Sequence, residues 1–298
     1  AAAKIATLLR SGRFDLLHLN EPHALTAAWL AGAHRRVRLL LSRRIGFPLG
    51  KSWVSQARYR AVTRFLPNSV TVAQSLLQCG IAHNRISVVN EGVAIPPLTT
   101  AEQRAEARRH WSIHDEVFLF GCVSVFVPEK GQRHAIEALA RLREKHPTAR
   151  LFLAGDGPCR GEIAALTAKL AQTEAVLMPG FVQDVDSVYA ALDGFVFPSE
   201  FEGLGTALQA AMALAIPSIS TARGALGEVV TANKTALVVE PDGAAFAAAM
   251  QQLMEDGTLR HRLGEAGRKE IAERFSAERM VANTLRIYES VLQQESKA

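Results

Sequence analysis

The chain has 298 residues, of which 48% are hydrophobic, and this is enough apolar material for two packed domains. It contains no run of about eighteen apolar residues, and its start does not resemble a signal peptide, so we expect no membrane-spanning segment. The three cysteines are odd in number and widely spaced, which argues against a disulfide framework or a zinc site and indicates a reducing, cytoplasmic location.

The net charge of +5 is unevenly distributed along the chain. Residues 1–95 contain 13 Lys and Arg against 3 Asp and Glu, and nine of these basic residues lie between Arg35 and Arg64. This clustering favours contact with anionic lipid or an anionic acceptor, although a solvated helix face would give the same pattern. Nucleic acid is disfavoured because no aromatic residues alternate with the arginines as a stacking platform.

The first part of the chain alternates helical and strand-like segments. Residues 4–9 have the apolar spacing of a helix, and the short apolar runs after them predict buried strands. These runs are residues 15–19, 37–41, 69–72 and 86–89. Because the opening helix should follow a strand, we expect the first domain to lack its first strand and βα turn, as in a truncated chain or a partial reading frame.

The pattern is interrupted at residues 90–100, where Gly92 and the pair Pro96-Pro97 predict a joint between domains. Six further strands are expected at residues 117–125, 149–154, 175–178, 194–197, 218–220 and 236–239. Helical periodicity marks residues 133–144, 160–170 and 205–214. We therefore predict an α/β fold with doubly wound parallel sheets in two domains, residues 1–95 and 96–275, followed by a last helix at 276–298 with Ser276 as its N-cap.

The segment from Pro198 to Ala207 contains the richest candidate site. It follows the predicted strand at 194–197 and precedes a helix of small residues, and helix N-termini beyond the carboxyl ends of strands bind anions. Gly203 and Gly205 would let a phosphate approach the backbone, and Glu202 would accept hydrogen bonds from sugar hydroxyls. A tight turn with an acidic helix start would leave the same pattern.

A second strand-to-helix junction, at residues 125–131, contains Lys130. This cation would point into the same crevice, where a diphosphate leaving group needs its charge neutralised, whereas the alternative is an ordinary exposed lysine. A third junction at residues 154–158 has Pro158 placed for a helix start and is interpreted as structural, with Asp156 as a secondary candidate.

In chain order, these segments together resemble family 4 of the retaining glycosyltransferases. The matching motifs are Pro128-Glu129-Lys130-Gly131, Gly155-Asp156-Gly157-Pro158, Gly180-Phe181-Val182 and Pro198-Ser199 with Glu202-Gly203-Leu204-Gly205. The resemblance covers nearly the whole chain, is strongest over residues 117–240, and implies a GT-B fold of two Rossmann-like domains with the first truncated. It also implies that the last helix crosses back to the first domain.

The resemblance assigns roles to the matching residues. It implies that Lys130 binds the donor diphosphate and that Glu202 binds hydroxyls of the donor sugar, which makes these two the catalytic candidates. The turn at Phe181 and Val182 would hold the nucleobase through main-chain contacts. Backbone amides would cap a phosphate, and the residues that would supply them are Gly203, Leu204, Gly205 and Thr206.

The first domain resembles the family more loosely. Residues 17–23 resemble the segment that faces the acceptor, and Glu21 is an acceptor-side candidate because Pro22 ends the strand beside it. Arg43 and Arg44 occupy the region where many relatives place a histidine close to the donor sugar, and we count them as acceptor-side candidates. His18 is explained as well by a structural role as by a functional one.

Two positions in the second domain depart from the family pattern. Ala210 stands where a second acidic residue usually grips the ribose, and Val125 stands where many members have an arginine. Gln209 is next to Ala210 but is rotated by about 100° around the helix axis, so it is a poor substitute. Loss of a charge-assisted hydrogen bond typically costs about 1.5–3 kcal/mol, so these changes would weaken donor binding.

The leading hypothesis is an enzyme that transfers a sugar, hexosyl or heptosyl, from a nucleotide-diphospho-sugar to a glycan or lipid-linked acceptor with retention, in cell-envelope or polysaccharide synthesis. No metal or other cofactor is expected, since no Asp or His cluster has ligand spacing. One alternative is a degenerate or truncated homologue that binds nucleotide weakly, and another is a GT-B sugar epimerase. A dehydrogenase is disfavoured because no G-x-G-x-x-G opens a βαβ unit.

Overall fold

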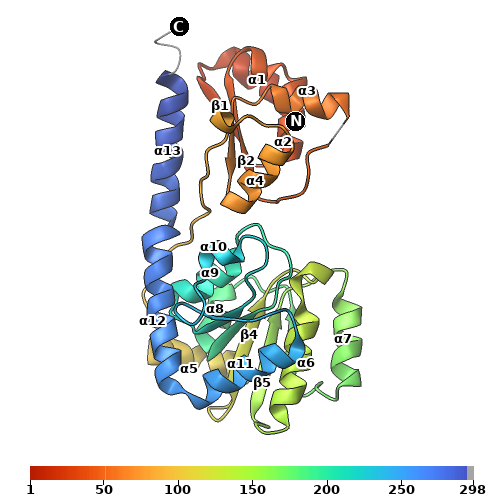
Figure 1. Ribbon diagram of the computed structural model, residues 1–298, viewed down its shortest axis with the longest axis vertical. Helices are drawn as coiled ribbons and strands as arrows, with labels where there is room; N and C mark the ends of the chain where they lie inside the picture. The colour runs from red at the N-terminus through yellow and green to blue at the C-terminus, as the bar shows by residue number, and fades with distance from the viewer. Residues whose placement is uncertain (51, 294–298) are drawn as a thin grey trace. The chain divides into compact units, whose positions relative to one another are not determined.

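Figure 1 shows the computed structural model, which describes residues 1–50 and 52–293. The chain divides into two compact units. Unit 1 comprises residues 1–92 together with the C-terminal segment that begins at Ala277, and unit 2 runs from Val93 to Ser276. Among the described residues, no helix combines the length and the hydropathy that crossing a bilayer requires.

Unit 1 contains a parallel sheet in the order β1-β2-β3. Its strands are β1 (Leu16–Leu19), β2 (Arg38–Arg43) and β3 (Arg64–Pro67). One face packs against the helices that alternate with these strands, namely α1 (Ala2–Ser11), α2 (Pro22–Leu30), α3 (Trp53–Arg60) and α4 (Val70–Gln78), with short 3-10 turns at Ala33–Arg35 and His83–Arg85. The opposite face packs Leu40 and Leu66 against Ile287 and Val291 of the last helix, α13 (Ala277–Gln293).

Of the four strands predicted in this unit, the one at residues 69–72 is wrong and the one at residues 86–89 is only partly formed. Residues 69–72 begin α4 rather than forming a strand, because the Ser69 hydroxyl caps the helix by accepting a hydrogen bond from the Val72 amide at 3.1 Å. The third strand lies just before this cap, at Arg64–Pro67. Residues 86–89 run beside β3 but form only an isolated bridge, between Phe65 and Ile86.

Unit 2 contains a six-stranded sheet in which every pair of neighbours is parallel. The order is β6-β5-β4-β7-β8-β9. The strands are β4 (Phe118–Val123), β5 (Ala149–Ala154), β6 (Val176–Gly180), β7 (Gly194–Phe197), β8 (Ser218–Ser220) and β9 (Leu237–Val238). All six strands predicted for the second domain are present, and the doubly wound α/β class is confirmed.

Helices cover both faces of this sheet. One face packs against α6 (Gln132–Arg143), α7 (Arg160–Lys169) and α11 (Gly243–Glu255). The other packs against α5 (Ala101–His110), α8 (Val185–Ala191), α9 (Thr206–Ala213), α10 (Leu226–Val229) and the end of α12 (Gly257–Arg274). Side chains of β5 and β7 alternate between the two cores, as Leu151 and Phe152 do, which explains why these strands are apolar throughout.

Candidate active site

The strand order of unit 2 reverses between β4 and β7. The chain builds outward from β4 to β6 on one side and then from β7 to β9 on the other, while β4 and β7 pair directly through Phe120 and Gly194. In open α/β sheets, ligands bind beyond the carboxyl ends of the strands at such a reversal. The segments that leave β4 and β7 contain Lys130 and Glu202, so the topology brings the two sequence-predicted residues to this edge.

Hydrogen bonds join these two segments. The Glu129 carbonyl accepts from the Glu200 amide at 2.8 Å and from the Ser199 hydroxyl at 3.1 Å. The Thr221 hydroxyl, which follows β8, donates to the Ser199 carbonyl at 2.6 Å. Ser199 and Thr221 are buried, and no role for either could be predicted from the sequence, because their contacts depend on which strands are neighbours.

Gly131 allows the closest approach between the two segments. Its φ is +64°, in the left-handed region, and a Cβ there would lie 2.2 Å from the Pro198 carbonyl oxygen. A residue with a side chain is therefore opposed both by the backbone conformation and by this contact. The glycine turns the chain directly from Lys130 into α6 and fixes the lysine at the sheet edge.

Lys130 and Glu202 form an ion pair, between the lysine Nζ and the Glu202 Oε1. The Ser199 hydroxyl oxygen lies 3.2 Å from the same carboxylate oxygen, which shares the single proton of this hydroxyl with the Glu129 carbonyl. The Lys130 side chain is 21% exposed and that of Glu202 is 10% exposed, so both are partly removed from water and can still be reached. A partly desolvated cation and carboxylate in contact can bind an anion and a hydroxylated group side by side.

The N-terminus of α9 lies next to this pair in the chain. Gly205 is its N-cap with a φ of +79°, and among the described residues no side chain caps the helix. The first backbone N–H groups are thus available to an anion, at the positive end of the helix dipole. Leu204 is 2% exposed and its side chain belongs to the core, so only its backbone, with that of Gly203 and the exposed Thr206, can serve a ligand.

The predicted nucleobase turn follows β6. Gly180 has a φ of +92°, and Phe181 after it is 81% exposed, while Val182 packs partly against the core. Gly180 is buried, so Phe181 is the exposed residue of this turn. The Asp156 carboxylate accepts from the Gly157 amide at 2.8 Å, which fits the structural interpretation of its turn.

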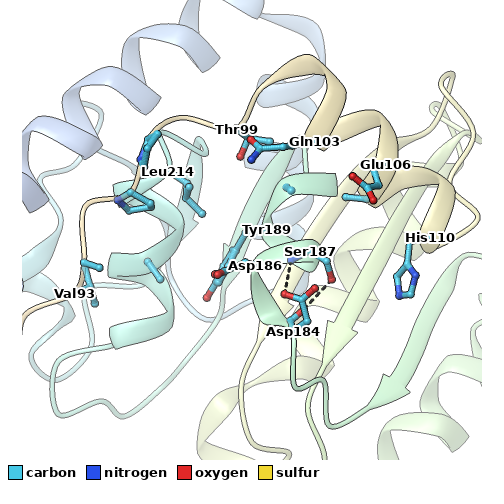
Figure 2. A pocket seen from close by; sticks show the side chains of 16 residues that line it. Val93, Thr99, Gln103, Glu106, His110, Asp184, Asp186, Ser187, Tyr189 and Leu214 are labelled. Carbon is cyan, nitrogen blue, oxygen red and sulfur yellow. Dashed lines mark hydrogen bonds between the residues drawn. The ribbon is translucent and has the colours of Figure 1, made fainter.

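A cavity of about 670 Å³ lies in the helical layer of α5, α8 and α9. Figure 2 shows residues that line it, including Tyr189 and Asp186 from α8 and Leu214 from the end of α9. Ala210 also lines this cavity, so the wall is a methyl group where the family resemblance led us to look for a carboxylate. Gln209 is fully buried, and its amide atoms have no hydrogen-bond partner among the described residues, so it does not supply the missing group.

Val125 stands where many members of the family have an arginine. It is 49% exposed, and its side chain supplies no charge to the site. The segment before Glu202 holds a further charged group that the sequence did not reveal. Glu200 Oε1 lies 3.0 Å from His134 Nε2 and 2.8 Å from the Arg133 guanidinium. The hydrogen bond from His134 is the main cause that lowers the pKa of Glu200. These partners are far apart in sequence, so no local pattern could indicate the contact.

The acceptor-side candidates of unit 1 have different surroundings. Arg43 is 8% exposed and its guanidinium donates to the Phe47 carbonyl at 2.5 Å, so it holds a loop in place. Arg44 is exposed and forms an ion pair with Glu91 at 3.0 Å. Glu21 is exposed at the N-cap position of α2.

His18 is engaged at both ring nitrogens. Its Nδ1 lies 2.6 Å from the Tyr288 hydroxyl of α13, and its Nε2 lies 2.8 Å from the Ser42 hydroxyl. Burial, with a smaller effect from Arg44, lowers the pKa of His18. His18 therefore joins β1, β2 and α13, which favours its structural interpretation.

Comparison with known proteins identifies the family. A family model described as glycosyl transferases group 1 matches residues 103–270, and a second, described as glycosyltransferase family 4, matches residues 1–95. A Bacillus subtilis protein named as glycosyltransferase EpsD is 31% identical over 202 residues, which are 67% of this chain and 52% of EpsD. The lipopolysaccharide core biosynthesis glycosyltransferase LpsE of Rhizobium meliloti is 34% identical over 154 residues, which are 51% of this chain and 44% of LpsE.

The chain thus spans about half the length of these curated relatives. Among solved structures, Anabaena HepE in complex with UDP and glucose aligns with a TM-score of 0.84 at 21% identity, over 98% of this chain and 81% of HepE. At this identity the likeness shows the fold, which is GT-B. With a family model matched over more than half of its residues, the chain belongs to the glycosyl transferases group 1 family.

Proposed function

We propose that this chain binds a nucleotide-diphospho-sugar in unit 2 and transfers the sugar to an acceptor hydroxyl with retention of anomeric configuration. The observation that carries the proposal is the Lys130–Glu202 ion pair, next in the chain to an uncapped helix N-terminus and located where the strand order reverses. The family membership and the UDP and glucose in the HepE complex support a nucleotide-sugar as the donor.

In this proposal the positive charge of the site acts on the leaving group. The bond from the anomeric carbon to the diphosphate oxygen breaks, and negative charge accumulates on the nucleoside diphosphate. Lys130 and the N–H groups at the start of α9 neutralise that charge, which stabilises the transition state more than the ground state. The oxygen of the acceptor hydroxyl forms the new bond to the same carbon, and its proton passes to the departing diphosphate oxygen. No metal ion is part of the proposal.

Glu202 has the complementary role. The donor diphosphate would compete with Glu202 for Lys130. The Glu202 carboxylate would then accept hydrogen bonds from hydroxyls of the donor sugar. The Ser199 hydroxyl, 3.2 Å from Glu202 Oε1, would turn its proton toward the carboxylate and keep it in position during this exchange. By holding the sugar in a fixed orientation relative to the diphosphate, Glu202 would lower the activation free energy of transfer.

We further propose a glycan or lipid-linked acceptor, a role in cell-envelope or polysaccharide synthesis, and a cytoplasmic location at the inner face of the membrane. The support is the name of LpsE, which refers to lipopolysaccharide core biosynthesis, together with the basic composition of residues 1–95. The exposed Arg44 and Glu21 are the acceptor-side residues to test in this unit.

A weakly binding, non-catalytic homologue is the second candidate. Ala210 and Val125 favour it, because both place an apolar side chain where the resemblance led us to expect a charge. Each missing charge-assisted hydrogen bond would reduce donor affinity by roughly tenfold or more.

An assay of donor turnover separates these candidates. Single UDP- and GDP-sugars would be incubated with the protein and a membrane extract as acceptor, and release of UDP or GDP would be measured. We expect Glu202→Gln to reduce turnover by about 10²-fold or more, because the sugar loses a positioned carboxylate. Glu129→Gln is the matched control, since its carbonyl, rather than its side chain, joins the two segments.

Turnover at the wild-type rate in Glu202→Gln would refute the assigned role. An epimerised sugar formed without any acceptor would instead indicate an epimerase. Absence of turnover with every donor would favour the non-catalytic homologue.

A further inference from the structure

The cavity among α5, α8 and α9 contains acidic side chains that have no part in the proposed function. Three carboxylates line it, from Glu106 of α5, from Asp184 just before α8, and from Asp186 in the first turn of α8 (Figure 2). The Asp184 Oδ1 accepts from the Ser187 amide at 3.3 Å and so caps α8. Asp186 is exposed, and within the described residues its carboxylate has no hydrogen-bond or ion-pair partner.

Asp186 lies on the part of α8 that meets the start of α9. Tyr189 follows three residues later, is 4% exposed, and donates its hydroxyl proton to the Ala207 carbonyl of α9 at 3.1 Å. Residues three apart are neighbours on a helix surface. Burial is the main cause that raises the pKa of Tyr189, with smaller effects from Cys122 and from Asp186. The Asp186 carboxylate is therefore close to the contact between α8 and the first turn of α9.

The proposed donor would pass this carboxylate. Its diphosphate would bind at the uncapped start of α9, and its base at the turn of Phe181 and Val182, a few residues before α8 begins. The ribose joins these two parts, so it would lie over the first turns of α8 and α9. On α9, Ala210 follows Thr206 by one turn, or about 6 Å, on the same face of the helix. Ala210 lines the cavity with a methyl group, which leaves room for the ribose but offers it no polar contact.

We propose that Asp186 binds the ribose of the donor nucleotide by accepting hydrogen bonds from its 2′- and 3′-hydroxyl groups. An ionised carboxylate has two acceptor oxygens and no donor, which suits two neighbouring hydroxyls, and hydrogen bonds to a charged group are the strong ones. The inference rests on the nucleotide-diphospho-sugar proposed above. It assigns to α8 a contact that the methyl group of Ala210 cannot make from α9.

Isothermal titration calorimetry with UDP, GDP and their 2′-deoxy counterparts tests the proposal without an acceptor. We expect the wild type to bind its preferred ribonucleotide about tenfold more tightly than the 2′-deoxy form, which lacks one hydrogen bond to a charged group. Asp186→Ala should bind the ribonucleotide about tenfold or more weakly and should bind the two forms with similar affinity. Adding Ala210→Glu to Asp186→Ala should restore the preference, because residue 210 lines the same cavity.

Glu106→Ala is the matched control, since it removes a carboxylate from the same cavity at a different place. Glu106 lies in the second half of α5, where Arg108 pairs with Asp193 at 3.2 Å, directly before β7. This is the amino end of the strand, opposite the edge where ligands bind. Glu106→Ala should keep the wild-type preference. Circular dichroism would check that each variant folds, and the wild-type comparison needs no variant.

The outcomes separate this inference from the proposed function. Absence of binding by UDP and GDP would overturn both. Equal affinity of the wild type for the ribo and deoxy forms would overturn this inference alone. So would an unchanged preference in Asp186→Ala, a lost preference in Glu106→Ala, or a folded double variant that binds the two forms alike.

Discussion

Gly131 is a single residue on which the geometry of the candidate site depends. Its positive φ and the 2.2 Å distance from an added Cβ to the Pro198 carbonyl oxygen both oppose a side chain. We expect Gly131→Ala to lower the free energy of unfolding by at least about 2 kcal/mol, because left-handed backbone costs roughly 1–2 kcal/mol for alanine and the contact adds to it. Urea unfolding would measure this.

Gly161→Ala is the matched control for this prediction. Gly161 lies in α7, and in the described part of the chain nothing approaches within 4 Å of an added Cβ. Alanine there should stabilise the protein by about 0.5 kcal/mol, since glycine is a poor helix former. Equal effects at the two positions would contradict the account of the Gly131 turn.

At the scale of single residues, the sequence predicts the charged groups of the site better than the residues that hold them in place through hydrogen bonds. Lys130 and Glu202 could be found because each follows an apolar strand and stands beside a glycine. Ser199 and Thr221 could not, because their hydrogen bonds cross between segments that follow different strands. Arg43 and Arg44 look alike in sequence, yet one is buried under a loop and the other is exposed.

His18 connects three elements of unit 1 and should make their packing depend on pH. Burial lowers its pKa from 6.5, so the unfolded chain takes up a proton at a higher pH than the folded unit. Its contribution to stability is therefore complete above about pH 6.5 and is lost as the pH falls towards the folded-state pKa. We expect His18→Gln to flatten the pH dependence of the unfolding free energy in this window.

His83→Gln is the control, because His83 is exposed and its replacement should leave that pH dependence unchanged. The measurement is chemical denaturation at a series of pH values from neutral to mildly acidic. Identical pH profiles for wild type and His18→Gln would contradict the assignment of the effect to His18.

At the scale of elements, the strands of unit 2 were predictable because they are buried on both faces and form continuous apolar runs. Residues 194–197 and 218–220 match β7 and β8 to the residue. Residues 69–72 were misassigned because Ser-Val-Thr-Val alternates like a strand and is rich in β-branched residues. The Ser69 side chain caps α4, so this segment folds as the first turn of a helix.

At the scale of the molecule, the alternation of strands and helices predicts the α/β class, while the strand order comes from the structure. The reversal between β4 and β7 explains why residues separated by more than seventy positions form an ion pair. It also explains why two short motifs, each weak alone, become a site when their strands are neighbours.

Isothermal titration calorimetry with UDP- and GDP-sugars tests the central claim most directly, because donor binding by unit 2 requires no knowledge of the acceptor. We predict saturable binding of at least one such sugar and a loss of about tenfold or more in Lys130→Met, since one charge-assisted contact to the diphosphate disappears. Lys169→Met, at an exposed lysine of α7, should bind like the wild type. Absence of binding for every nucleotide-sugar, or equal affinity in Lys130→Met, would contradict the account.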